Sequence, residues 1–157
     1  MSGEQRRPNG LLLWFFRLGP KLYRWRLGWL LGRRLLLLEH TGRTSGLARE
    51  TALEVMRYDT AGGAYIVVAV FGSSSDWYRN ILAGPQVTIR VGGRSYPAVA
   101  QPLDPTAAYD EFVSYGARHR LFVRLLPKIS GIPFDGSEAS YRRVAEELPL
   151  VALSVHQ

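Results

Sequence analysis

From residue 34 onward, the alternation of apolar and polar positions predicts strands. Leu35–Glu39 is a short apolar run, Glu50–Tyr58 alternates with a period of two, and Ala64–Val70 is an unbroken apolar run rich in β-branched residues. A run of the last kind is typical of a strand that is buried on both faces. Turn-forming residues fill Asp59–Gly63, so the second and third runs are expected to form an antiparallel hairpin.

Three helices are expected between and after these strands. The first begins after Ser74 or Ser75, whose hydroxyl can cap it, and ends before Gly84-Pro85. The other two cover residues 104–119 and Glu138–Glu147. The segment between the second and third helices has no assignment from its pattern.

A second hairpin and a closing strand complete the pattern. Gln86–Val91 and Arg94–Leu103 flank the turn Gly92-Gly93, residues 148–155 form the last strand, and Pro97 indicates an edge strand or a bulge. Short turns pair the strands, and no β-α-β rhythm occurs. The expected fold class is therefore α+β, mainly antiparallel β: a barrel of about six strands with peripheral helices.

The composition is that of one ordinary domain. A chain of 157 residues with 46% hydrophobic residues can bury a single core. It has no cysteine, which excludes disulfides and thiolate chemistry and fits a reducing cytoplasm. The histidines His40, His119 and His156 lack ligand spacing, so no metal site is expected.

The net charge of +7 is concentrated at the N-terminus. Residues 1–34 hold eight Lys or Arg and one Glu, whereas residues 35–157 hold twelve Lys or Arg and twelve Asp or Glu. A neutral body with a basic arm favours a local anionic partner. It argues against a specific nucleic-acid function, because no recognition motif accompanies the charge.

Residues 1–33 are expected to form a basic amphipathic arm, followed by a body domain over residues 34–157. The arm holds three of the four tryptophans, and its longest uncharged run, Pro8–Phe16, is well short of the roughly 20 residues that span a bilayer. Gly19-Pro20 divides it into two short helices. Its apolar face either lies on an anionic membrane through residues 8–34, or packs on the protein's own core or on a second subunit.

The loop "TGRTSGLAR" between the first two strands has the chemistry of an anion site. Its glycines permit positive φ, so backbone N–H groups can converge, and its hydroxyls and guanidinium groups suit a phosphate or carboxylate. It is not a P-loop, and no GxGxxG fingerprint occurs. The alternative is a solvated hairpin turn. The candidate ligands are Thr41, Gly42, Arg43, Thr44, Ser45, Gly46 and Arg49.

A second cluster, "VFGSSSDWYRN", follows the buried third run. Phe71 and Gly72 leave the sheet where a flat ring could lie against backbone, and Trp77, Tyr78 and Asn80 open the next helix. The free N–H groups of that helix start favour a polar or anionic edge. The alternative is that Trp77 and Tyr78 are core residues.

Together, "LLLLEHTGRTSGLARETAL", "YIVVAVFG", "DWYRNILAGPQVTIRVGG" and "ELPLVAL" resemble the deazaflavin-dependent nitroreductase family. The resemblance covers roughly residues 35–103 and the last strand. It implies a split β-barrel that binds coenzyme F420. Thr41 to Gly46 and Arg49 would hold the phosphate-bearing tail, and the ring system would be lined by Val70, Phe71, Gly72, Ser73, Trp77, Tyr78 and Asn80.

The same resemblance implies a hydride transfer from the reduced deazaflavin to a quinone, a nitroaromatic or a similar conjugated acceptor. The candidates for a proton donor are Tyr109, Tyr115 and Tyr141. Two alternatives stay open: an FMN- or FAD-binding protein on the same barrel, and a non-redox module that binds lipid or fatty acid. A homodimer, and a cytoplasmic location or a peripheral one on the inner face of the membrane, are further expectations.

Overall fold

The computed structural model describes residues 35–156, with the backbone alone at residues 122 and 123. The expected N-terminal arm, residues 1–33, lies outside the described residues. No helix in the described range is both long and apolar enough to cross a membrane.

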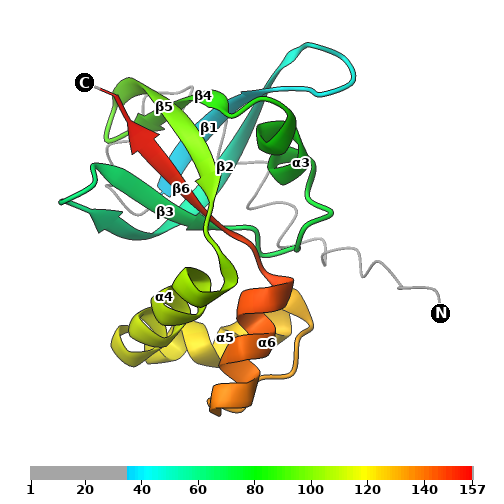
Figure 1. Cartoon of the computed structure of the whole chain (residues 1–157), viewed down its shortest axis with the longest axis vertical. Coiled ribbons are helices and arrows are strands. Elements are labelled where there is room, and N and C mark those ends of the chain that lie inside the picture. Colours follow the sequence, from blue (N-terminus) through cyan, green and yellow to red (C-terminus); the bar gives the residue numbers. More distant parts are fainter. Residues whose placement is uncertain (1–34, 157) are drawn as a thin grey trace.

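Six antiparallel strands close into a barrel, in the order β1-β2-β3-β6-β5-β4 (Figure 1). This confirms the predicted fold class. Each neighbouring pair runs antiparallel, and β1 closes the barrel by pairing with β4 through Glu39 opposite Thr88. The strands are β1 (Leu35–Thr41), β2 (Ala48–Asp59), β3 (Ala64–Val68), β4 (Gln86–Val91), β5 (Arg94–Pro102) and β6 (Leu150–Val155).

The two predicted hairpins form, and their glycines explain why. Gly63 ends the β2–β3 turn with φ +62°, and both residues of the β4–β5 turn, Gly92 and Gly93, have positive φ. Two successive positive φ values match the right-handed twist of the flanking strands in a two-residue hairpin. β3 ends at Val68, so Val70, expected inside this strand, lies in the following turn.

The expectation that Pro97 marks an edge strand or a bulge is wrong. β5 pairs with both β4 and β6, and it faces β4 in an unbroken register in which Pro97 lies opposite Thr88. The ladder with β6 begins one residue later, at Ala98. Pro97 therefore lies just outside the β5–β6 ladder, where its missing N–H costs no ladder hydrogen bond. A proline can thus stand here although β5 is not an edge strand.

In the described part of the chain, four helices accompany the barrel. α3 (Asp76–Ala83) lies beside it, and α4 (Pro105–Arg118), α5 (Arg120–Ser130) and α6 (Glu138–Glu147) form a layer at one end (Figure 1). The carboxylate of Asp104 caps α4 by accepting a hydrogen bond from Ala107 N. α5 occupies the segment that the sequence pattern left unassigned.

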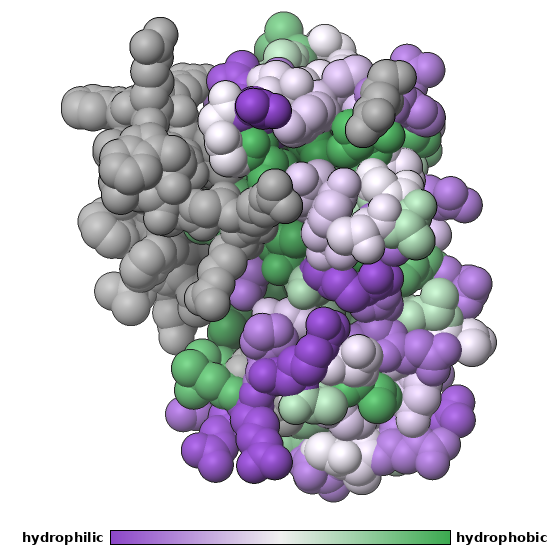
Figure 2. Space-filling view, turned by 90° about the vertical axis from the view of Figure 1, so that its left-hand side faces the viewer, coloured by the Kyte–Doolittle hydropathy of each residue, from purple (hydrophilic) through white to green (hydrophobic). Residues whose placement is uncertain are grey.

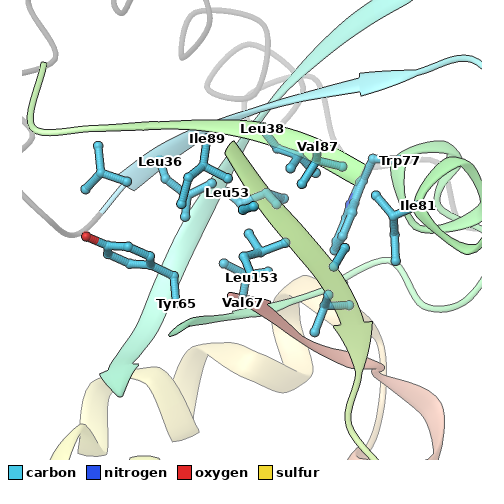
Figure 3. Packing of buried hydrophobic residues seen from close by; sticks show 14 of the residues in the cluster. Leu36, Leu38, Leu53, Tyr65, Val67, Trp77, Ile81, Val87, Ile89 and Leu153 are labelled. Carbon is cyan, nitrogen blue, oxygen red and sulfur yellow. The ribbon is translucent and has the colours of Figure 1, made fainter. Parts of the chain in front are cut away.

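The barrel and the helical layer have separate apolar cores. Inside the barrel, Leu36, Leu38, Val67, Ile89 and Leu153 point toward one another (Figure 3). The alternate residues of β3 and β6 face the other way and pack with α4 and α6 in the second core. β3 is buried at every position because both of its faces contact a core, which is why its sequence is continuously apolar.

Candidate functional site

The loop between β1 and β2 is a compact turn closed by its own backbone. Gly42 N donates to Leu47 O and Gly46 N donates to Gly42 O, both at 2.8 Å. Gly46 has φ +68°, and a Cβ added to Gly42 would lie 2.5 Å from Ser45 Oγ, which itself accepts a hydrogen bond from Leu47 N. The positive φ of Gly46 favours glycine at that position, whereas a Cβ at Gly42 would force the Ser45 hydroxyl to move.

Arg43 ties this loop to α3, whose start lies next to it (Figure 1). The backbone N and Nη1 of Arg43 both donate to Asn80 Oδ1, at 3.0 and 2.9 Å, and Nη2 forms an ion pair with Asp76 at 3.2 Å. The guanidinium of Arg43 is thus occupied by partners within the protein. It fixes the loop and is not free to contact a ligand with its whole fork.

A buried polar chain continues from Asn80 to β1 and β2. Asn80 Nδ2 lies 3.1 Å from His40 Nδ1, and His40 Nε2 lies 3.1 Å from Thr51 Oγ1. The two donors of Arg43 require the oxygen of Asn80 on their side, so the amide group faces His40. His40 Nδ1 must then accept, and the Nε2–H must donate to Thr51.

His40 is held neutral by this environment. Its side chain is only 5% exposed. Burial lowers the pKa of His40, nearby Arg49 lowers it further, and Asp76 partly opposes both effects. A protonated His40 would also point an N–H at the Asn80 amide, which removes that hydrogen bond.

The rest of the loop is available to a ligand. The hydroxyls of Thr41, Thr44 and Ser45 are exposed, and so is Arg49. Among the described residues, Arg49 forms no ion pair with a carboxylate. The loop therefore presents hydroxyl donors and one uncommitted guanidinium from a turn whose backbone is fixed by Arg43.

The second predicted segment, Val70–Ser73, runs from β3 to α3. Gly72 has φ +80°, and a Cβ there would lie 3.3 Å from the backbone oxygen of Glu147 at the end of α6. Val70 packs against the helical-layer core, whereas Phe71 is 36% exposed. This segment therefore passes close to the end of α6 at Gly72 and carries one partly exposed aromatic ring, that of Phe71.

The expected cap of α3 is partly wrong. Ser75 does stand at the N-cap position, but its hydroxyl makes no capping hydrogen bond. It donates instead to Gly72 O at 2.8 Å, which stabilises the turn before the helix. The first N–H groups of α3 therefore have no side-chain cap from Ser75.

Trp77, Tyr78 and Asn80, which were expected to line a ring, differ in what they expose. Trp77 is 8% exposed and belongs to the barrel core, as Figure 3 shows, with Tyr78 half-buried against it. Asn80 is 5% exposed, and both ends of its amide are used by Arg43 and His40. Trp77 therefore packs in the barrel core, and Asn80 holds the loop after β1 through Arg43, so neither side chain is exposed to a ligand.

The three candidate proton donors lie in the helical layer. Tyr115 is buried there, with its hydroxyl 3.4 Å from Glu54 Oε1. Tyr109 packs under the guanidinium of Arg142, and Tyr141 packs edge-on against Phe134. The contact residues Glu54, Arg142 and Phe134 belong neither to the loop after β1 nor to α3.

A hollow of about 570 Å³ opens beside the same loop. Its walls are the end of β1, the start of β4 and residues 97–99 of β5, and they include Glu39, Gln86 and His156. These three residues had no signal in the sequence, because the hollow is created by the closure of β1 onto β4. The described residues contain no cluster of three or more side chains suited to a metal ion.

Comparison with known proteins identifies the relatives of this chain. It is 38% identical over 73 residues to an F420H(2)-dependent quinone reductase of Mycobacterium tuberculosis, an alignment that covers 45% of this chain and 47% of that protein. The chain therefore spans about half the length of the curated relatives it matches.

Solved structures share the fold at low sequence identity. An F420-H2 dependent reductase has a TM-score of 0.53 at 19% identity, covering 78% of this chain and 96% of the other. A conserved hypothetical protein of Mycobacterium tuberculosis has a TM-score of 0.54 at 17% identity, covering 84% and 79%. A family model described as F420H(2)-dependent quinone reductase matches residues 22–119. The chain belongs to the F420H(2)-dependent quinone reductase family.

Proposed function

We propose that this protein is a coenzyme F420-dependent oxidoreductase that reduces a quinone, a nitroaromatic or a similar conjugated acceptor. Membership of the family supports the coenzyme and the quinone. When bound, the reduced deazaflavin supplies the hydride that the acceptor takes up, and the protein supplies binding and orientation. FMN and FAD are not needed to explain the site.

The observation that carries the proposal is that Arg43 bonds within the protein while Arg49 is exposed to a ligand. Arg43 is held by Asn80 and Asp76, so the turn is rigid before any ligand arrives. Arg49 and three hydroxyls then face solvent from a preorganised backbone. A phosphate needs donors in fixed positions around several oxygens, and this set fits that need.

The ring end of the coenzyme is expected along Val70–Ser73 and the start of α3. Phe71, which is 36% exposed, presents part of its aromatic ring to solvent there. The uncapped N–H groups of α3 can donate to a carbonyl edge of the ring. Trp77 and Asn80 act here as positioning residues, because their own atoms are occupied by the barrel core and by the polar chain.

A titration tests the coenzyme assignment. Oxidised F420 is added to the pure protein while tryptophan fluorescence is followed, with FMN and FAD in parallel. Selective binding of the deazaflavin supports the proposal. Binding of FMN or FAD with no response to F420 would instead favour the flavin alternative. If F420 binds, turnover of menaquinone by the F420H2-loaded enzyme tests the acceptor.

The basic N-terminal arm is proposed to bring the protein to the membrane, where lipid-soluble acceptors are found. We propose that residues 8–34 contact the anionic inner face of the membrane, which would present lipid-soluble quinones to the site. Removing residues 1–33 should lower partition onto anionic liposomes, and equal partition of both chains would exclude this role. A homodimer stays a prediction, to be checked by light scattering.

A further inference from the structure

Helix α5 carries a surface that the proposed function does not use. Arg120, Arg124 and Lys128 are all exposed and follow one another at intervals of four residues, so they form one row along the helix. Leu121 and Leu125 form the adjacent row, and they are 68% and 39% exposed. A row of cations therefore lies directly beside a row of exposed leucines.

The charge of this surface is not neutralised locally. No Asp or Glu occurs from residue 112 to residue 134, whereas Arg118, Arg120, Arg124 and Lys128 all fall within that stretch. Across residues 35–156, the ion pairs with carboxylates are made by other arginines. The body of the chain is neutral as a whole, so this local excess is a feature of α5 and its approach.

The attachment of α5 to the rest of the protein uses its opposite side. Among its described side chains, Leu126 is the one that enters the helical-layer core. Figure 2 shows the helical layer, in the lower part of that view, with hydrophobic and hydrophilic residues side by side on its surface. Within residues 35–156, packing does not explain exposed leucines on a helix that is already anchored by another side.

We propose that α5 is a membrane-contacting helix, whose leucine row enters an anionic lipid surface while its cationic row binds the headgroups. Apolar residues beside Lys and Arg on one short helix are the arrangement of an interfacial helix. α5 has eleven residues, about 16 Å, so it lies along the surface. This inference concerns a segment other than the N-terminal arm and is independent of the coenzyme.

The chain has no cysteine, so a single one can report on α5 directly. Leu121→Cys is labelled with an environment-sensitive fluorophore in the full chain, and vesicles of phosphatidylcholine with phosphatidylglycerol are added. The emission should shift to the blue. Leu82→Cys, at an exposed leucine on α3, is the matched control and should not shift. If the vesicles bind the protein and the label at 121 does not shift, the proposal is overturned.

Two charge variants distinguish binding of vesicles through α5 from general electrostatic attraction of the whole protein to anionic lipid. R120Q/R124Q/K128Q and R94Q/R142Q/R143Q each remove three positive charges from exposed positions. The α5 triple should weaken vesicle binding on the order of a hundredfold, because each basic residue near an anionic surface contributes about fivefold. The control triple should change it by less than about fivefold. Equal losses in both triples would overturn the proposal.

Leucine variants distinguish lipid from other polyanions or a second copy. L121S/L125S should weaken vesicle binding about tenfold. Unchanged binding in this variant, with loss in the α5 charge triple, would indicate a purely electrostatic partner and contradict membrane insertion. A blue shift of the label at 121 that grows with protein concentration and needs no vesicles would assign the surface to a second copy of this chain.

Discussion

Arg43 donates two hydrogen bonds to a single oxygen of Asn80, one from its backbone N–H at 3.0 Å and one from Nη1 at 2.9 Å. The two residues are 37 positions apart in the chain. This contact joins the loop after β1 to helix α3 and makes Asn80 the anchor of the candidate phosphate site. Asn80 Nδ2 also bonds His40 Nδ1, and His40 lies in β1, so Asn80 links the loop and α3 to the barrel.

Replacing Asn80 by Ala should therefore destabilise the protein and weaken coenzyme binding. The substitution leaves the buried Nδ1 of His40 and two part-buried donors of Arg43 without their hydrogen-bond partner, which costs about 2–3 kcal/mol of the free energy of unfolding. Urea denaturation measures this cost, and the F420 titration measures the binding. Combined with Arg43→Ala, the loss should be less than the sum of the two single losses. Additive losses would show that the contact is not an energetic unit.

His40 should make the stability of the protein depend on pH. Its folded-state pKa is lowered below the ordinary value of about 6.5, with burial as the main cause. The unfolded chain then binds the proton more tightly, so this contribution is present above about pH 6.5 and is lost as the pH falls toward the folded pKa.

The measurement is the free energy of unfolding from urea titrations between about pH 5 and pH 8. His40→Gln removes the titrating group, so the difference between the native chain and this variant should shrink as the pH falls. Carboxylates titrate in both proteins and cancel in the comparison. A difference that does not vary with pH would mean that His40 keeps an ordinary pKa.

Arg49→Ala should weaken F420 binding by about 1.5–3 kcal/mol, the scale of a lost charge-assisted hydrogen bond. The stability of the protein should hardly change, because Arg49 is exposed and forms no ion pair within the described residues. Arg94→Ala, at another exposed arginine, serves as the control in the same quenching titration. Equal binding by both variants would remove Arg49 from the phosphate site.

Phenylalanine at positions 109, 115 and 141 should leave turnover within about twofold of the native rate. Positioned general acids contribute about a hundredfold or more, so a proton donor would be obvious in this test. Tyr115 is buried against Glu54, and the other two are packed by Arg142 and Phe134. A hundredfold loss of kcat in one variant, with normal stability, would assign it as the donor.

The sequence alone determined the strands, the hairpins and two of the helical-layer helices. Local signals suffice for these elements: glycine pairs that need positive φ, an unbroken apolar run for β3, and Asp104 before Pro105 for α4. The loop after β1 was also visible, since glycines, hydroxyls and arginines were adjacent in the chain.

Only the tertiary structure decided what each of these residues does. Arg43 binds α3 through Asn80 and Asp76, whereas Arg49 makes no ion pair within residues 35–156. His40 became a buried neutral link because Asn80 and Thr51 meet it from different elements. Pro97 was accommodated inside a closed barrel because the β6 ladder begins after it. The order of apolar, polar and glycine residues along the chain sets the local backbone conformation. The hydrogen-bond partner of a polar side chain, in contrast, is set only when distant elements meet in the closed barrel.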